Sequence, residues 1–309
     1  MAKKPVSEKA IVKARATESS YDAVGCTSIK ALIPDVAFFL DVESLNVVAS
    51  AALTSIGCVA IDMARANPFD VAEGVFNCIA GVPTADPDGD AISVVSSFYS
   101  TLDVTEQLVS HGRTMSTGTQ RWWGVAHKKA VEAVTANTCA SLDQALKQIV
   151  DFMRVQMDKR TQSLSVADRK TAYENVKVYA RGTHFDVAAV ETLMFDVLGL
   201  LPATSAHTAF DGALWFYRSP RDTRSYVDGL KRGAKNYLTP DDFDQLSKSF
   251  DRNVKEMQKH INMQLANYTG DIDYMNGAAH HPVYDVFYDY LMVYNWQFPD
   301  TNCTTTAIA

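Results

Sequence analysis

The segment Val36-Ala37-Phe38-Phe39-Leu40-Asp41-Val42-Glu43 contains a short apolar run that leads into two carboxylates. A run of this length, rich in strand-forming residues, predicts a buried strand. Because strand side chains alternate between two faces, Asp41 and Glu43 project from the same face at the strand end. Neighbouring buried anions need protons or cations to compensate them, and oxygen ligands are those that hold Mg²⁺ or Mn²⁺. The segment therefore predicts a central strand with a candidate metal site; the alternative is two solvated carboxylates beside a loop.

The rest of the chain predicts an α/β fold in which helices flank a mixed five-stranded sheet. Three closely spaced strands favour an antiparallel meander, and a later strand–helix–strand pattern adds parallel strands. After the first strand, we expect strands at 54–62, 92–102, 177–180 and 213–217, and helices at 142–159, 186–198, 241–265 and 281–296.

Turn signals and charge patterning predict one domain with additions. Three prolines and several Gly and Asp residues between Ala66 and Asp90 indicate a loop or insertion. The mixed-charge run from Lys231 to Lys259 is most simply a solvated helix face. The expected organisation is an N-terminal arm at 1–30, a domain at 31–297 with insertions at about 66–91 and 226–270, and a C-terminal tail at 298–309.

The composition is that of a globular protein: 309 residues, 47% hydrophobic and 21% charged. Five scattered cysteines without a C-x-x-C pair favour reduced thiols over a disulfide framework or zinc site. We expect a soluble, cytoplasmic protein, because the sequence contains neither a secretion signal nor an uninterrupted apolar membrane span. The net charge of −7 argues against a non-specific nucleic-acid coating protein. It does not argue against an acidic site whose divalent cations invert the local charge.

Two more groups of polar residues are candidate site residues. Asp186 opens a helix directly after a strand, where an ordinary N-cap role is the simpler explanation. His280 precedes the last predicted helix, and Asp285 lies one turn inside it, after Pro282 in the first turn. Histidine titrates near neutrality and can take a proton from water while a nearby carboxylate holds a metal. The alternative is an exposed histidine ahead of an ordinary helix start.

Taken together, these residues occur in the order of one known pattern. The chain resembles the DEDD 3′–5′ exonucleases of the RNase H-like superfamily, in the branch whose general base is histidine. The matching positions are Asp41, Glu43, Asp186, His280 and Asp285. A narrower resemblance, to the phage exonuclease A type, spans roughly residues 36–295. Its motifs are Phe39-Leu40-Asp41-Val42-Glu43-Ser44-Leu45, Ser55-Ile56-Gly57, Ser116-x-x-Thr119-x-x-Trp122-Trp123, Arg181-Gly182-x-x-Phe185-Asp186 and Arg221-Asp222-Thr223-Arg224.

The resemblance implies an RNase H-like exonuclease domain that uses two divalent cations, Mg²⁺ or Mn²⁺, roughly 3.5–4 Å apart. It implies that Asp41 bridges both cations and that Glu43 and Asp285 hold the one that carries the attacking water. Asp186 would hold the other cation, and His280 would act as the general base.

The same motifs supply candidates for substrate binding, with ordinary core packing or surface ion pairing as the alternative for the aromatic, apolar and arginine residues among them. These candidates are Ser44, Leu45, Phe185, Trp122 and Arg224. Ser44 stands where the family usually has Thr and keeps the hydroxyl. Gly182 stands where many cellular members have Asn, which argues against the proofreading and oligoribonuclease branches.

Three functions remain open from the sequence. The first is hydrolysis of DNA 3′ ends, single-stranded or frayed, to nucleoside 5′-monophosphates, in the host cytoplasm if the chain is phage-encoded. The second is a 3′–5′ exoribonuclease or oligoribonuclease of the same fold, since discrimination depends on a 2′-hydroxyl contact that sequence does not show. The third is a catalytically inactive exonuclease-fold module that binds nucleic acid or a replication partner. The intact carboxylates and histidine argue against this third function.

Overall fold

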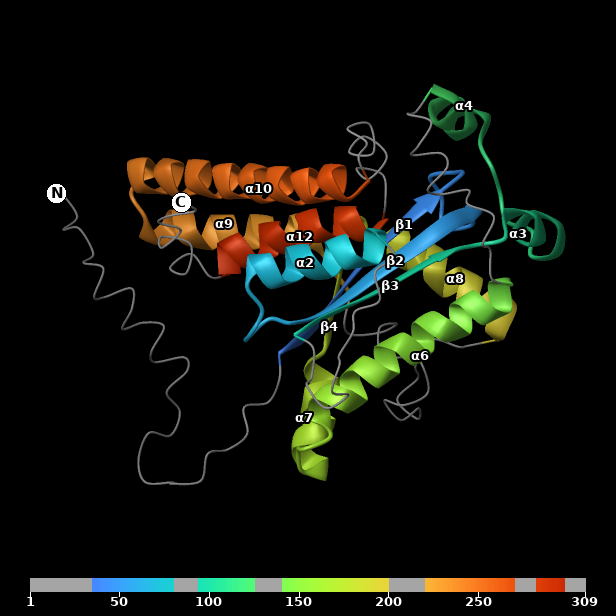
Figure 1. Cartoon of the computed structure of the whole chain (residues 1–309), viewed down its shortest axis with the longest axis horizontal. Helices are drawn as coiled ribbons and strands as arrows, with labels where there is room; N and C mark the ends of the chain where they lie inside the picture. The colour runs from blue at the N-terminus through green and yellow to red at the C-terminus, as the bar shows by residue number, and fades with distance from the viewer. Residues whose placement is uncertain (1–34, 81–93, 126–140, 200–219, 270–281, 298–309) are drawn as a thin grey trace.

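The computed structural model describes five stretches of the chain, residues 35–80, 94–125, 141–199, 220–269 and 282–297 (Figure 1). The expected arm at 1–30, the expected strand at 213–217 and the expected tail at 298–309 lie outside the described residues.

A mixed five-stranded sheet with the strand order β3-β2-β1-β4-β5 forms the centre of the fold. β1 (Val36–Ser44) pairs antiparallel with β2 (Leu53–Asp62), which pairs antiparallel with β3 (Val95–Thr101). β4 (Lys177–Ala180) runs parallel to β1, and β5 (Pro220–Asp222) runs parallel to β4. The predicted α/β class is therefore confirmed, with a three-stranded meander and two parallel strands. The fifth described strand lies a few residues after the expected segment.

The central strand β1 is buried on both faces, as its apolar run predicts. Phe38 and Phe39 point to opposite faces, and both are completely buried. Phe39 stacks on Tyr179 of β4 at a centroid distance of 4.8 Å, and Tyr290 meets it edge-on at 5.9 Å. Each such aromatic side chain contributes about 1.5–3 kcal/mol through burial alone. This packing fixes the strand that carries Asp41.

Helices α6 (Leu142–Thr161), α7 (Val166–Asn175) and α8 (Asp186–Leu198) cover the face of the sheet that includes Phe38 (Figure 1). The Ser141 hydroxyl caps α6 by accepting a hydrogen bond from the Gln144 amide at 3.3 Å. The predicted helix starts at 142 and 186 are confirmed.

Helices α2 (Pro68–Ile79), α9 (Thr223–Tyr237), α10 (Pro240–Thr269) and α12 (Pro282–Gln297) cover the opposite face (Figure 1). α2 corrects the expectation of a loop from Ala66. Its Asn67 side chain accepts from the Asp70 amide, while the Asp70 carboxylate accepts from the Asn67 amide. Pro68 occupies the first turn, where its missing N–H costs nothing, so the proline starts a helix instead of breaking one.

Two short helices, α3 (Val104–Ser110) and α4 (Thr117–Val125), follow β3 and lie beyond the C-terminal end of β1 (Figure 1). Among the helices of the described residues, none combines the length and the apolar character that a bilayer crossing requires.

We expect Phe39→Ala to destabilise the protein by about 3–5 kcal/mol, because it leaves a cavity between β1, β4 and α12. Denaturant unfolding followed by circular dichroism measures this loss. Phe69→Ala is the matched control, since Phe69 is 41% exposed and its truncation should cost much less. Equal losses for the two variants would contradict a core centred on β1.

Candidate active site

Three carboxylates converge at the C-terminal end of β1, and we call them the carboxylate cluster. Asp41 and Glu43 come from β1, and Asp285 comes from the first turn of α12. One carboxylate oxygen from each residue lies within 4.8 Å of the others, and all three residues are half-buried. Asp41 and Glu43 are brought together by the two-residue period of the strand, whereas Asp285 depends on how α12 packs across the sheet. Three oxygens this close can hold a divalent cation.

Asp186 lies beside the carboxylate cluster, at the start of α8. Its side chain is buried, and its Oδ2 accepts a hydrogen bond from the Gly182 amide at 3.1 Å. Its negative charge raises the pKa values of both Asp41 and Glu43. The N-cap explanation for Asp186 is wrong: Phe185 is the N-cap of α8, and the Asp186 side chain accepts from an amide that precedes the helix, not from one in its first turn. The burial of Asp186 and its effect on the two β1 carboxylates place it in the site instead.

The acidic residues repel one another strongly enough to change their protonation. Burial, followed by repulsion from Asp285 and Asp186, raises the pKa values of Asp41 and Glu43 well above their usual range. Burial is also the main cause that raises the pKa of Asp186 to about 7 and that of Asp285 to about 6. These shifts show that the site holds more negative charge than the neighbouring positive groups of the protein neutralise.

Sequence reasoning missed a partly buried ion pair next to the cluster, formed by Arg181 and Asp289. Arg181 Nε donates to Asp289 Oδ1 at 2.9 Å, and its Nη1 donates to Asp285 Oδ1 at 3.3 Å. The guanidinium also lies over the Tyr288 ring, 4.8 Å from its centroid. Burial raises the pKa values of Asp285 and Asp289, and the Arg181 charge acts in the opposite direction. The available sequence signal was the spacing of Asp285 and Asp289, which are one helical turn apart on the same side of α12.

A hollow of about 340 Å³ lies next to the cluster. It is lined by Glu43, Ser44, Val47, Gly118, Thr119, Trp122 and Trp123. Trp123 is buried, and its indole N–H donates to the Ser44 carbonyl at 3.0 Å, which ties α4 to the end of β1. Trp122 is 48% exposed and meets Trp123 edge-on at 4.9 Å. One tryptophan is therefore core and the other presents its ring at the surface of the hollow.

The start of α4 explains how Trp122 reaches this hollow. The Ser116 hydroxyl accepts a hydrogen bond from the Thr119 amide at 2.9 Å, in the manner of a helix cap. The Ser116 amide in turn donates to the Leu45 carbonyl at 2.8 Å, so the loop after β1 and the beginning of α4 are tied together.

The remaining predicted site residues lie in different surroundings. Leu45 is half-buried and is not among the residues that line the hollow. Phe185 is half-buried and packs against the core cluster that includes Phe38. This agrees with core packing, which was the alternative to a substrate-binding role. Arg224 is exposed at the start of α9, and its charge acts on Asp289. His280 lies outside the described residues, so its role as general base stays a prediction.

We expect the metal-free protein to lose stability as the pH rises from about 4 to about 7. The folded site holds protons that the unfolded chain has already released in this range, because the folded pKa values of Asp186 and Asp285 are raised to about 7 and about 6. Their stabilising effect is present below the unfolded pKa and is lost as the pH passes the folded one. Urea unfolding in chelator at pH 5 and pH 8 should differ by on the order of 2–4 kcal/mol.

Mg²⁺ should restore much of this loss at pH 8 and little at pH 5. The Asp41→Asn protein serves as the control, since it carries one anion fewer and should depend less on pH. A metal-free protein that is equally stable at both pH values would contradict the accumulation of uncompensated charge.

We expect Arg181→Ala to weaken divalent-cation binding about 10–100-fold, because Asp285 loses the contact that orients it. Manganese titration by calorimetry measures the affinity, and Asp289→Asn should produce a smaller loss in the same direction. Arg65→Ala is the matched control: Arg65 pairs with Asp62 at the opposite end of the sheet. Tighter cation binding by Arg181→Ala would show instead that the guanidinium competes with the metal.

A family model described as a 3′-5′ exoribonuclease Rv2179c-like domain matches residues 36–308, which include every described residue of the site. A search of curated proteins finds no match.

Proposed function

Because the chain belongs to the Rv2179c-like 3′-5′ exoribonuclease domain family, we propose that it hydrolyses nucleic acid from the 3′ end with the help of two divalent cations. The observation that carries this proposal is the approach of Asp41, Glu43 and Asp285, whose oxygens lie within 4.8 Å of one another. Family membership supports a 3′–5′ exonuclease in general. The metal, the residue roles and the kind of nucleic acid are our inferences.

The donor set of the site fits Mg²⁺ or Mn²⁺. All candidate ligands are carboxylate oxygens, which hard divalent cations prefer over softer metals. The neighbours that act most strongly on Asp41 and Glu43 are other carboxylates, so their charges oppose one another until a cation enters. Divalent cations would relieve this repulsion, and their binding would therefore stabilise the folded site.

We assign the carboxylate cluster and Asp186 as the residues that hold the cations. When bound, such a pair of ions activates the attacking water and stabilises the leaving 3′-oxygen of the phosphodiester. Arg181 hydrogen-bonds both Asp285 and Asp289, and its charge partly offsets the burial that raises the pKa of Asp285. His280 is assigned to take the proton from the attacking water, a contribution typically worth about 10²–10⁴ in rate.

The hollow beside Glu43 is suited to the terminal nucleotide. The half-exposed Trp122 offers an aromatic face for a base, and such stacking is worth about 1–3 kcal/mol without sequence preference. Trp123 holds α4 against Ser44 and so keeps Trp122 next to the carboxylates. Arg224, exposed on the neighbouring helix α9, is a further candidate for phosphate contact, whereas Phe185 is better explained as core.

RNA is the substrate that we propose first, because the description of the family names an exoribonuclease. DNA is the second candidate, favoured by the resemblance of the Ser116-x-x-Thr119-x-x-Trp122-Trp123 and Arg181-Gly182-x-x-Phe185-Asp186 motifs to the phage exonuclease A type. Stacking on Trp122 accepts either, so the preference depends on contacts to the sugar.

Matched RNA and DNA oligonucleotides with a 5′ label test the proposal directly. Incubation with Mg²⁺ should shorten the label-bearing strand one nucleotide at a time and release nucleoside 5′-monophosphates, and chelation should stop the reaction. The relative kcat/KM values on RNA and DNA decide between the two substrates. Binding of both oligonucleotides without any Mg²⁺-dependent shortening would favour the inactive binding module instead.

We expect two substitutions to affect this activity differently. Asp41→Asn should abolish turnover and weaken manganese binding, because it removes one of the carboxylates that would hold the cations. His280→Ala should reduce kcat about 10²–10⁴-fold, because the histidine is assigned to take the proton from the attacking water. It should leave manganese binding unchanged, because His280 is not assigned to hold a cation. Calorimetric titration and single-turnover kinetics separate the two effects. Near-wild-type turnover of His280→Ala would reject His280 as the general base.

A further inference from the structure

We propose that the outward face of α10 binds the phosphate backbone of the nucleic acid whose 3′ end enters the carboxylate cluster, an inference that rests on the proposed function. Four cations on this face, which we call the α10 stripe, would contact consecutive phosphates upstream of the scissile bond. The stripe consists of Lys248, Arg252, Lys255 and Lys259.

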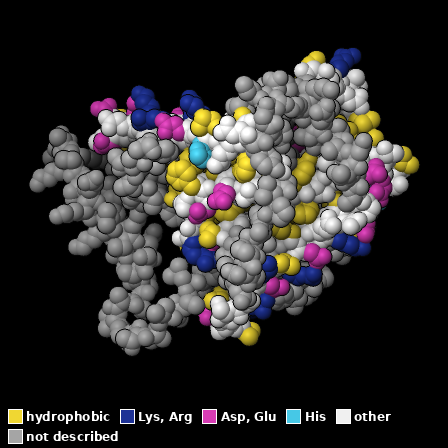
Figure 2. Space-filling view, viewed as in Figure 1, with side chains coloured by type: hydrophobic (Ala, Val, Ile, Leu, Met, Phe, Trp, Pro, Cys, Tyr) yellow, Lys and Arg dark blue, Asp and Glu magenta, His cyan; other side chains and the backbone are white. Residues whose placement is uncertain are grey.

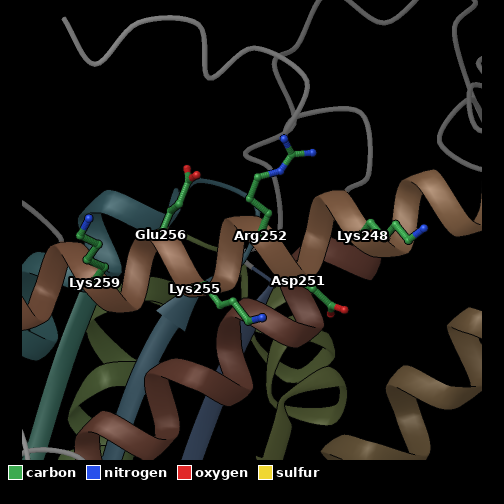
Figure 3. A pocket seen from close by; sticks show the side chains of 6 residues that line it. All are labelled: Lys248, Asp251, Arg252, Lys255, Glu256 and Lys259. Carbon is green, nitrogen blue, oxygen red and sulfur yellow. The ribbon is translucent and has the colours of Figure 1, made fainter.

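The spacing of the four cations places them on one line along the helix. They recur at intervals of four, three and four residues within α10. At 3.6 residues per turn this spacing keeps them within an arc of about 60° and spreads them over about 16 Å along the axis. Figure 3 shows these side chains on α10, together with those of Asp251 and Glu256. By the same geometry the two acids fall on either side of the stripe.

The stripe lies on the side of α10 that is opposite to its packed side. Phe250, Val254, Ile261 and Leu265 are buried in the core beneath the helix. The stripe residues are exposed, and in Figure 2 Lys and Arg side chains stand beside Asp and Glu along this edge of the molecule. The cations are therefore accessible to a long ligand without any rearrangement of the fold.

Three of the four stripe residues form no ion pair with any described residue. Within the part of the chain that the structure describes, Lys248 pairs with Asp244 at 2.7 Å, and no ion pair engages Arg252, Lys255 or Lys259. Asp251 and Glu256 lie three or four residues from members of the stripe, so acids are interspersed with its cations. On α6, Lys147 pairs with Asp143 and Arg154 with Asp151, whereas the exposed Lys159 enters no ion pair among the described residues. The three stripe cations that have no ion pair are available to an external anion.

The turn of α10 that follows the stripe contacts the start of α12, which carries Asp285. Asn262 follows Lys259 by one helical turn and hydrogen-bonds Tyr284, the residue next to Asp285. In Figure 1 the C-terminal end of α10 lies on the same side of the molecule as the N-terminal end of α12. A strand whose 3′ end reaches the carboxylates can therefore continue along α10.

A linear polyanion is the ligand that fits this surface. The four cations are spread over about 16 Å along one helix and do not converge on one point, which suits an extended anion better than a small one. A nucleic-acid backbone presents charges at regular intervals along a line, and each phosphate contact releases counter-ions. The whole chain carries a net charge of −7, so a local cationic track provides the attraction that the chain as a whole does not.

The test compares Arg252→Ala/Lys255→Ala/Lys259→Ala with the parent protein on single-stranded oligonucleotides of 2 to 20 nucleotides. For the 20-mer, we expect kcat/KM at low salt to fall about tenfold and the slope of its logarithm against log salt to flatten by about 2, as three lost contacts predict. kcat/KM for the dinucleotide, which is too short to reach the stripe, should stay unchanged. The control Lys147→Ala/Arg154→Ala/Lys170→Ala removes the same residue types from the opposite face.

Fluorescence anisotropy of a labelled 20-mer measures binding without turnover and should show the same loss of affinity and of salt dependence. A triple variant with parental affinity and parental salt slope on the 20-mer overturns the proposal. An equal loss in the control variant also overturns it, because the effect would then be one of net charge. Failure of the parent protein to hydrolyse even the dinucleotide would reject the proposed exonuclease function, and the binding measurement would still decide whether α10 contacts nucleic acid.

Discussion

Repulsion among carboxylates at the C-terminal end of β1 is the constraint around which this protein is built. Asp41, Glu43 and Asp285 bring oxygens within 4.8 Å of one another, and Asp186 adds a fourth charge beside them. Burial makes each charge more costly than it would be in water. Such a site persists only because the surrounding structure supplies the free energy to hold it. Divalent cations would relieve that cost, and this is the physical basis of the proposed chemistry.

The supporting structure is the two-sided packing of the sheet. β1 is held by aromatic and aliphatic contacts on both faces, through Phe38 on one side and Phe39 on the other. α12 serves two purposes: its Phe287 and Tyr290 complete the core, and its Asp285 and Asp289 project toward the site. Fold stability and site geometry are therefore coupled through a single helix. Arg181, at the end of β4, links that helix to the sheet through charge.

The two proposed contact surfaces would divide the recognition of a nucleic acid into two kinds of contact. The hollow at Trp122 offers an aromatic face beside the carboxylates, which suits a single terminal base. The α10 stripe offers exposed cations along a helix whose next turn contacts the start of α12. Stacking does not distinguish bases, and phosphate contacts do not read sequence. This arrangement is suited to an enzyme that acts on many strands and removes one nucleotide at a time.

The sequence alone determined those features that depend on local periodicity. These features are the buried strand, the shared direction of Asp41 and Glu43, the starts of α6 and α8 and the mixed sheet. It also brought distant acids into one hypothesis through a family resemblance. The tertiary structure alone decided the ion pair of Arg181 with Asp289 and the tie of Trp123 to Ser44, and it resolved an ambiguous local signal into the helix at Pro68–Ile79. The first two join segments separated by about 80 or more residues, and no local period encodes such contacts. The prolines around α2 are compatible with a turn or with a helix start, and packing against the sheet selects the helix.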